Sequence, residues 1–174
     1  MRIVGGKYRH RNIIYPDDAT HTRPTKDRVR EAIFSALGDI SDMKVLDLYA
    51  GSGAMGIEAL SRGAKHATFV DISPIAIKVI KDNLTNLKVD PNEYEVIKNK
   101  DINAINYLKE KGSCFDLIIL DPPYEEGQYE EIVDLLNSMT TPTNIPAPPT
   151  EDGSYNLACT VTDGEVVYSW VSVE

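Results

Sequence analysis

The feature that most constrains the fold is a series of short apolar segments, each followed by a stretch with helical periodicity. Strands that alternate with helices are typical of a doubly wound α/β domain, in which a mostly parallel sheet has helices on both faces. The last of these apolar segments has almost no polar residue, as expected for a strand buried on both sides. We expect strands at 45–49, 67–71, 94–99 and 115–120, and helices at 25–37, after the glycine-rich turn to about 63, at 74–87, at 103–111 and from 129 to 139.

The two ends of the chain depart from this alternation. Residues 1–15 predict two short strands joined at Gly5-Gly6, and we assign 1–24 to an N-terminal extension. Residues 141–153 hold a proline-rich stretch that cannot continue a helix, so we expect a linker after a domain at 25–140. Residues 154–174 show the alternation and turn of a β-hairpin, which either joins the same sheet or forms a separate tail.

A glycine-rich turn follows the first strand of the alternating region. It contains Asp47, Gly51 and Gly53, and Asp71 lies 20 residues after Gly51 at the end of the next strand. This arrangement is typical of a nucleotide site, in which the glycines allow close backbone approach and the acid binds a ribose. An ordinary strand-end Asp that caps Ser73-Pro74 is the structural alternative for Asp71.

The position of Asp47 helps to choose the nucleotide. A pyrophosphate favours backbone N–H groups without a neighbouring anion. Asp47 is expected at the mouth of the turn, where it repels phosphate but tolerates an ammonium or a sulfonium group. The turn therefore favours S-adenosylmethionine over a dinucleotide.

A second motif, Asp121-Pro122-Pro123-Tyr124, follows the fourth strand. Ligands of open α/β sheets bind at these strand ends. The Asp121 carboxylate and the Pro122 carbonyl can accept hydrogen bonds from an exocyclic amino group, and Tyr124 can stack on a base. A rigid turn with a core tyrosine is the structural alternative.

Charge is distributed unevenly along the chain. The net charge of −9 argues against a nucleic-acid partner only if it is spread evenly. Residues 1–30 hold eight Lys and Arg against three Asp, whereas residues 125–174 hold ten carboxylates and no Lys or Arg. A basic front of this kind is either a solvated face or a platform that contacts phosphates.

Several segments together resemble the RsmD family of bacterial methyltransferases, which act on a guanine N2 amino group in small-subunit ribosomal RNA. The similarity runs from Met1 to about Leu136, and its motifs are MRIVGGKYRHRNI, TRPTKDRVREAIF, VLDLYAGSGAMGIEALSRGA, FVDIS and FDLIILDPPY. The resemblance implies a Rossmann-like fold that uses S-adenosylmethionine. The tail departs from the family pattern, so we expect a sheet altered at its C-terminal end, with an apolar edge beside 115–120 if a strand is missing.

The resemblance also implies roles for individual residues. Asp101, which by itself is typical of a helix N-cap, would contact the adenine amino group. The predicted cofactor residues are Asp47, Gly51, Gly53, Asp71 and Asp101. Asp121, Pro122 and Tyr124 are the predicted catalytic residues, and the predicted RNA contacts are Lys7, Arg9, Arg11 and Arg23.

Taken together, these patterns predict a cytoplasmic methyltransferase that forms N2-methylguanine in small-subunit ribosomal RNA. Neither cysteine lies in a metal-binding motif, and no run reaches the ~18 apolar residues of a membrane span, so we expect neither a metal nor a membrane partner. Three alternatives stay open: a truncated or catalytically impaired fragment that binds cofactor or RNA, a DNA adenine-N6 methyltransferase, and a protein glutamine methyltransferase.

Overall fold

A computed structural model describes residues 1–16, 27–121, 129–137, 154–162 and 165–173. Within them the chain forms a six-stranded sheet in the order β3-β2-β1-β4-β5-β6, and β1 to β4 are parallel. The strands are β1 (Lys44–Leu48), β2 (His66–Asp71), β3 (Tyr94–Lys98), β4 (Leu117–Leu120), β5 (Ser154–Thr162) and β6 (Glu165–Val173). The α-helices are α1 (Asp27–Leu37), α2 (Ala54–Ser61), α3 (Pro74–Leu87), α4 (Asp101–Glu110) and α5 (Tyr129–Asn137).

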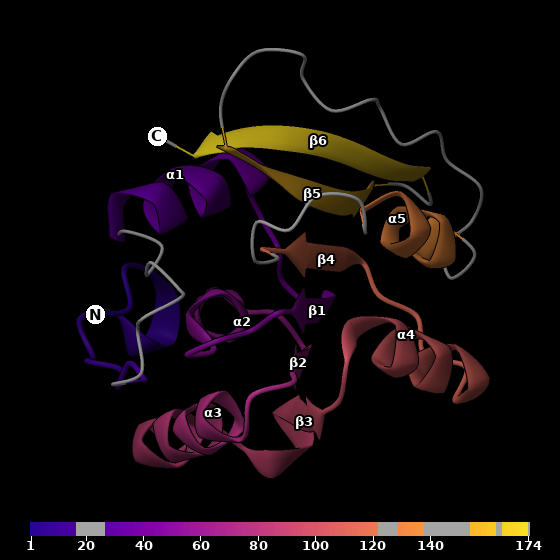
Figure 1. The fold of residues 1–174 in the computed structure, drawn as a ribbon. Coiled ribbons are helices and arrows are strands. Elements are labelled where there is room, and N and C mark those ends of the chain that lie inside the picture. The colour runs from indigo at the N-terminus through magenta and orange to yellow at the C-terminus, as the bar shows by residue number, and fades with distance from the viewer. Residues whose placement is uncertain (17–26, 122–128, 138–153, 163–164, 174) are drawn as a thin grey trace.

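The helices cover the two faces of the sheet, as the alternating pattern predicts. Figure 1 shows α1, α2 and α3 on one side and α4 and α5 on the other. Because side chains alternate along a strand, neighbouring residues enter different cores. Val45 belongs to the core under α2 and α3, whereas Leu46 belongs to the core under α4 and α5. The predicted doubly wound α/β fold is therefore confirmed.

The local signals placed most elements within one or two residues of their observed positions. Ser73 is the N-cap of α3, its Oγ accepts a hydrogen bond from the Ala76 N–H at 3.3 Å, and Pro74 follows at the first helical position. A proline fits there because the first helical N–H has no partner within the helix. Thr25, expected to begin the first helix, lies outside the described residues, and α1 is described from Asp27.

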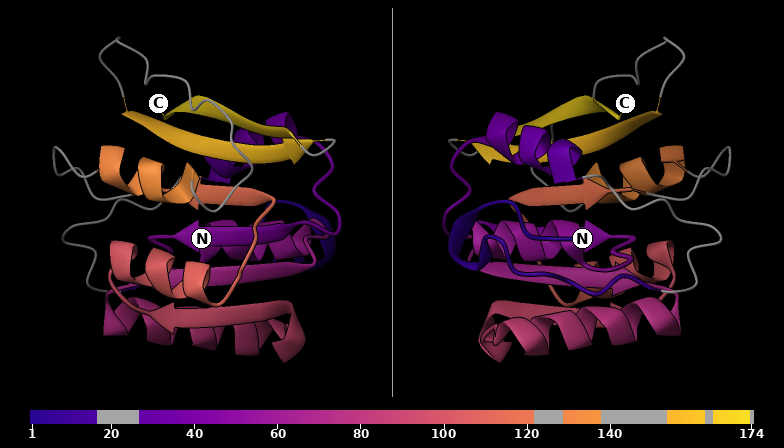
Figure 2. Two further views of the ribbon diagram at one scale, coloured as in Figure 1. Left: turned by 90° about the vertical axis from the view of Figure 1, so that its right-hand side faces the viewer. Right: turned by 90° about the vertical axis from the view of Figure 1, so that its left-hand side faces the viewer.

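The N-terminal arm, residues 1–16, differs from the predicted strand pair. Its two limbs are antiparallel, with Ile3 N–H bonded to the Arg11 carbonyl at 2.9 Å, but they form only an isolated bridge between Arg2 and Asn12. A 3₁₀-helix at Gly6–Tyr8 replaces the tight turn expected at Gly5-Gly6. The arm lies on the side of the sheet that carries α1 to α3 (Figure 2).

Contacts with α2 explain the altered turn. The backbone N–H groups of Val4 and Gly5 donate to the Glu58 carboxylate at 2.9 and 2.8 Å, and the Tyr8 N–H donates to Ser61 Oγ at 2.9 Å. A Cβ at Gly6 would lie 1.7 Å from the Ser61 carbonyl oxygen. The backbone of the arm therefore follows the surface of the C-terminal end of α2, and only glycine fits at position 6.

The C-terminal hairpin belongs to the same sheet. β5 pairs antiparallel with β4, from Leu117 opposite Thr160 to Leu120 opposite Leu157, and β6 pairs antiparallel with β5. Of the two possibilities left open for this hairpin, the structure shows the first, and β5 supplies a strand beside 115–120. The prediction that the sheet is altered at its C-terminal end agrees with the structure, because β5 pairs with β4 in the antiparallel direction.

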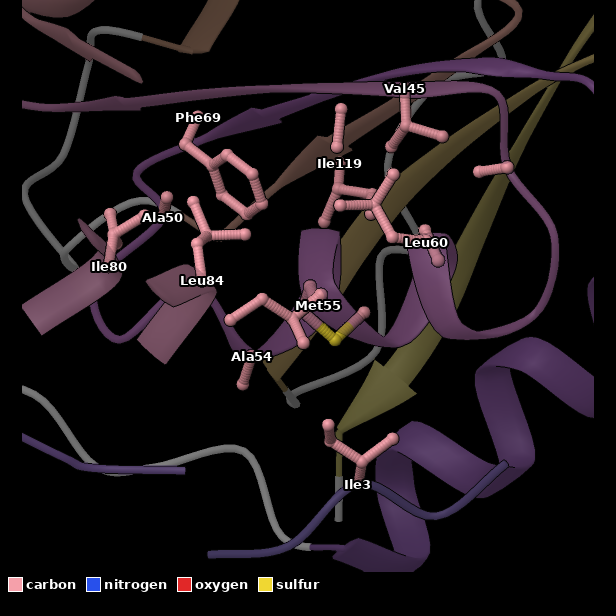
Figure 3. Packing of buried hydrophobic residues seen from close by; sticks show 14 of the residues in the cluster. Ile3, Val45, Ala50, Ala54, Met55, Leu60, Phe69, Ile80, Leu84 and Ile119 are labelled. Atoms are coloured by element: carbon pink, nitrogen blue, oxygen red, sulfur yellow. The ribbon is translucent and has the colours of Figure 1, made fainter. Parts of the chain in front are cut away.

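The core packs closely between α2 and β2. A Cβ at Gly56 would lie 2.3 Å from the Phe69 ring, so α2 approaches the sheet more closely than a side chain allows. Figure 3 shows Phe69, Ile80 and Leu84 gathered near the helix that carries Ala54 and Met55.

We predict that Gly56→Ala lowers the free energy of unfolding by about 1–3 kcal/mol, because the added methyl group must displace the Phe69 ring. Urea denaturation measures the change. The matched control is Gly56→Ala combined with Phe69→Leu, in which the smaller side chain should recover part of the loss. If Gly56→Ala lowers the free energy of unfolding by the same amount with and without Phe69→Leu, the two side chains do not interact and this packing is contradicted.

Candidate active site

Three acidic residues come together at the carboxyl ends of adjacent parallel strands. Leu48 of β1 pairs with Val70 of β2 and Leu120 of β4, and Asp71 and Asp121 are the residues that follow these two partners. Asp47 lies one residue earlier on β1, between its neighbours. Asp71 and Asp121 both raise the pKa of Asp47 through their charge, which places the three carboxylates in one electrostatic environment.

The glycine turn, residues 49–53, is fixed by β2. The backbone N–H groups of Tyr49 and Ala50 both donate to the Val70 carbonyl, at 3.0 and 2.9 Å. The Gly51 N–H donates to Asp71 Oδ2 at 2.8 Å. Gly51 has φ of 55°, and among the described residues no atom beyond its chain neighbours lies within 4 Å of the position of a Cβ there. The turn thus presents bare backbone to open space beside a carboxylate, which allows a ligand to approach closely.

Gly53 has a different environment from Gly51. It is buried at the N-cap of α2 with φ of 78°, and a Cβ there would lie 3.2 Å from Ile80 and 3.4 Å from Phe69. Both glycines were predicted to line a cofactor pocket. The structure gives Gly51 the open position, whereas Gly53 sets the backbone that begins α2.

Asp71 makes the local contacts of a strand-end Asp and also binds the glycine turn, while its ribose role stays a prediction. Its Oδ1 accepts from the Ser73 N–H at 2.8 Å, as expected for a residue that caps the following helix. Its Oδ2 holds the Gly51 N–H, which ties it to the glycine turn. Each carboxylate oxygen has a further lone pair, so these bonds leave acceptor capacity for a ligand hydroxyl.

Asp47 lies beneath the glycine turn and not at its mouth, so that part of the prediction is wrong. Its side chain is 2% exposed, and its Oδ2 accepts from the Gly56 N–H of α2 at 2.8 Å. Burial raises the pKa of Asp47 to about 7, the Gly56 hydrogen bond opposes the rise, and the charges of Asp121 and Asp71 add to it. Asp47 therefore binds α2 through the Gly56 N–H, and its carboxyl group has a pKa close to neutral pH.

Asp101 reaches the site from α4. It is the first residue of that helix, after Lys100 at the N-cap, so its expected capping position is off by one residue. Tyr49 Oη donates to Asp101 Oδ2 at 2.8 Å, which joins the glycine turn to α4. The sequence alone gave no sign of this contact.

Two functional candidates were missed by the motifs. Tyr49, with φ of 75°, is one. The other is Ile72, which directly follows Asp71 and whose side chain is 63% exposed beside the glycine turn's carboxylate partner. In the sequence, Ile72 could have been noticed as an apolar residue directly after the acidic residue at the end of the strand.

The DPPY motif is described only in part. Asp121 is exposed at the end of β4, beside β1, as predicted for a group that contacts substrate. Pro122 and Tyr124 lie outside the described residues, so their roles stay predictions.

The predicted RNA contacts lie on the N-terminal arm, although not on a strand. Lys7 Nζ pairs with Glu93 at 2.9 Å, and this hydrogen bond raises the pKa of Lys7 against the opposing effect of burial. Arg11 donates to the Asn86 carbonyl at 3.1 Å, and Arg9 is exposed. Arg23 lies outside the described residues. The expected alternation along one strand is wrong, because residues 6–8 form a 3₁₀-helix.

In the residues that the structure describes, no three His, Cys, Asp or Glu side chains are placed to hold a metal ion. Among the described helices, none is long and apolar enough to cross a bilayer.

The fold is that of the methyltransferases. The structure superposes on the solved "Putative methyltransferase yhhF from Escherichia coli" with a TM-score of 0.72 and 33% identity, covering 100% of this chain and 98% of that one. A Thermus protein, TTHA0928, gives a TM-score of 0.72 at 26% identity, with 99% of each chain covered. At 15% identity, the fold of SMU.776, a methyltransferase solved with S-adenosylhomocysteine, is also similar, with a TM-score of 0.61 and coverage of 84% of this chain and 49% of that one.

Residues 1–145 match the family described as "Conserved hypothetical protein 95", and the chain belongs to this family, which is the RsmD family. It is 39% identical over 137 residues to "Ribosomal RNA small subunit methyltransferase D" of Escherichia coli K12, covering 78% of this chain and 66% of that protein. The Haemophilus influenzae protein of the same name is 36% identical, with 78% and 70% covered. The match therefore spans just under two thirds of the Escherichia coli relative. The resemblance seen in the sequence motifs is confirmed.

We predict that Asp47 makes the protein less stable as the pH rises. Its pKa of about 7 in the folded chain exceeds the ordinary value of 3.8 for an Asp side chain. Its neutral form thus favours the folded state at low pH, and this contribution is lost between about pH 4 and pH 7. Asp47→Asn keeps an acceptor for the Gly56 N–H but cannot ionise. Urea denaturation between about pH 5 and pH 8 should give a flatter decline for the variant than for the wild type. Parallel curves would contradict the assignment.

Proposed function

We propose that this protein is an S-adenosylmethionine-dependent methyltransferase that forms N2-methylguanine in small-subunit ribosomal RNA. The observation that carries the proposal is the joining of the open Gly51 turn to the Asp71 carboxylate, with Asp121 exposed at the end of β4. Membership of the RsmD family supports the substrate class.

The residues at the strand ends fit S-adenosylmethionine better than a phosphate-bearing cofactor. Asp71 and the exposed Asp121 place negative charge at the strand ends, which repels a pyrophosphate and attracts a cation. Gly51 offers backbone without a side chain, Asp71 has acceptor capacity for ribose hydroxyls, and Ile72 offers an exposed apolar side chain for a base. Asp101, which accepts a hydrogen bond from Tyr49, would also accept one from the adenine amino group, as the family resemblance implies.

The bound cofactor would supply an electrophilic methyl group on a sulfonium centre. The protein itself would position the target amino group. Asp121 would accept a hydrogen bond from the guanine NH₂, which turns the nitrogen lone pair toward the methyl group. Pro122 and Tyr124 have the roles predicted from the motif, a second acceptor and a stacking surface.

The N-terminal arm is our proposed RNA contact. Arg9 is exposed, and Arg11 and Lys7 keep donor capacity beyond their bonds to Asn86 and Glu93. These cations contact phosphates without reading sequence, which suits a structured ribosomal RNA. Such a substrate places the reaction in the cytoplasm.

For the cofactor, we predict that Asp71→Ala weakens binding of S-adenosylhomocysteine about 10- to 100-fold, because a charged acceptor for the ribose and the Gly51 N–H is lost. Isothermal titration calorimetry measures the affinity. Asp90→Ala is the matched control, since Asp90 caps Asn92 N–H in the same way at 2.9 Å beyond the far end of α3. Unchanged affinity in Asp71→Ala would contradict the assigned ribose site. No binding by the wild type, with a non-cooperative melt, would favour the impaired-fragment alternative.

For the reaction, we predict transfer of labelled methyl groups to naked small-subunit ribosomal RNA, with N2-methylguanosine as the product after nuclease digestion. Asp121→Ala should lower kcat at least about 100-fold through loss of the orienting hydrogen bond. Asp116→Ala, before the opposite end of β4, is the control and should keep its activity. Label on DNA adenine or on protein glutamine, with none on RNA, would overturn the proposed substrate in favour of the corresponding alternative.

A further inference from the structure

Asn83, in the middle of α3, connects the N-terminal arm to the glycine turn. Its side chain is 1% exposed. Its Oδ1 accepts from the Ile14 N–H at 2.7 Å, and its Nδ2 donates to the Ile14 carbonyl at 2.9 Å and to the Ser52 carbonyl at 3.0 Å. One buried amide therefore holds two backbone segments that carry the proposed RNA and cofactor contacts.

The chemistry of an amide is required at this position. Only a side chain with a donor and an acceptor can satisfy both backbone groups of Ile14, and the second N–H of the same NH₂ group reaches Ser52. An Asp has no donor for either carbonyl, and an apolar residue leaves buried backbone groups without a partner. Leu would meet a requirement for core packing alone, but it could not form these three hydrogen bonds.

The arm has a second attachment that does not reach the glycine turn. Glu58 accepts from Val4 and Gly5, and Ser61 accepts from Tyr8, both near the C-terminal end of α2. Loss of the Glu58 contact would loosen the arm, while Asn83 would still hold Ser52. The two attachments can therefore be separated by substitution.

We propose that Asn83 is a positioning residue that couples the N-terminal arm to the glycine turn, so that cofactor binding and RNA binding strengthen each other. This inference rests on the proposed function for the identity of the two ligands. By linkage, whatever orders the turn also orders residue 14, and the reverse holds to the same extent. The coupling is carried by direct hydrogen bonds and requires no distant pathway.

The first test uses the wild-type protein. Hydrogen–deuterium exchange is measured with and without S-adenosylhomocysteine, and we expect slower exchange in both 50–54 and 12–16. Protection of 50–54 alone would overturn the coupling while leaving the cofactor site intact. If the nucleoside does not bind, the proposed function itself fails.

The second test compares variants in the methyl-transfer assay. Asn83→Asp should raise KM for both S-adenosylmethionine and RNA about tenfold, whereas Glu58→Gln should raise KM for RNA alone. Asn106→Asp, an exposed helical asparagine on α4, is the matched control and should change neither value. Equal effects of Asn83→Asp and Glu58→Gln on the two KM values would show that Asn83 serves only to hold the arm. If Asn83→Asp does not fold, the wild-type exchange experiment still decides.

Discussion

The geometry at the carboxyl ends of β1 and β2 depends on the burial of α2. All eight residues of this helix are buried, between β1 and β2 on one side and the N-terminal arm on the other. Such close packing requires Gly56 against the Phe69 ring, and it removes Asp47 from water while giving its carboxylate the Gly56 N–H. Packing against β1 and β2 holds the N-terminal end of this helix, which begins after Gly53, the last residue of the glycine turn.

That rigidity accounts for the geometry of the glycine turn. The turn is bonded to the Val70 carbonyl, to Asp71 and to Asn83, and Tyr49 connects it to Asp101. Contacts from β2, α3 and α4 thus meet at five residues. These contacts hold the bare backbone of Gly51 in position for a ligand, and through Asn83 they also join the turn to the N-terminal arm.

Much of the fold follows from local signals, because strand burial and helix capping depend on neighbouring residues. The Ser73-Pro74 start of α3 and the run of apolar residues in β4 illustrate this. The sequence also indicated the association of Asp71 with the glycine turn. The burial of Asp47, the 3₁₀-helix at Gly6–Tyr8 and the antiparallel pairing of β5 with β4 could not be predicted, since each depends on segments distant in sequence. The role of Asn83 was hidden for the same reason, as its partners Ile14 and Ser52 lie 69 and 31 residues away.

The central claim is that an adenosyl cofactor binds over Gly51 with its ribose on Asp71. A crystal structure of the protein with S-adenosylhomocysteine tests it most directly. The account predicts ribose hydroxyls within hydrogen-bond distance of the Asp71 carboxylate, with the amino-acid part of the ligand along the turn of residues 49–53. A nucleoside bound elsewhere on the protein, with Asp71 in contact only with Gly51 and Ser73, would contradict it.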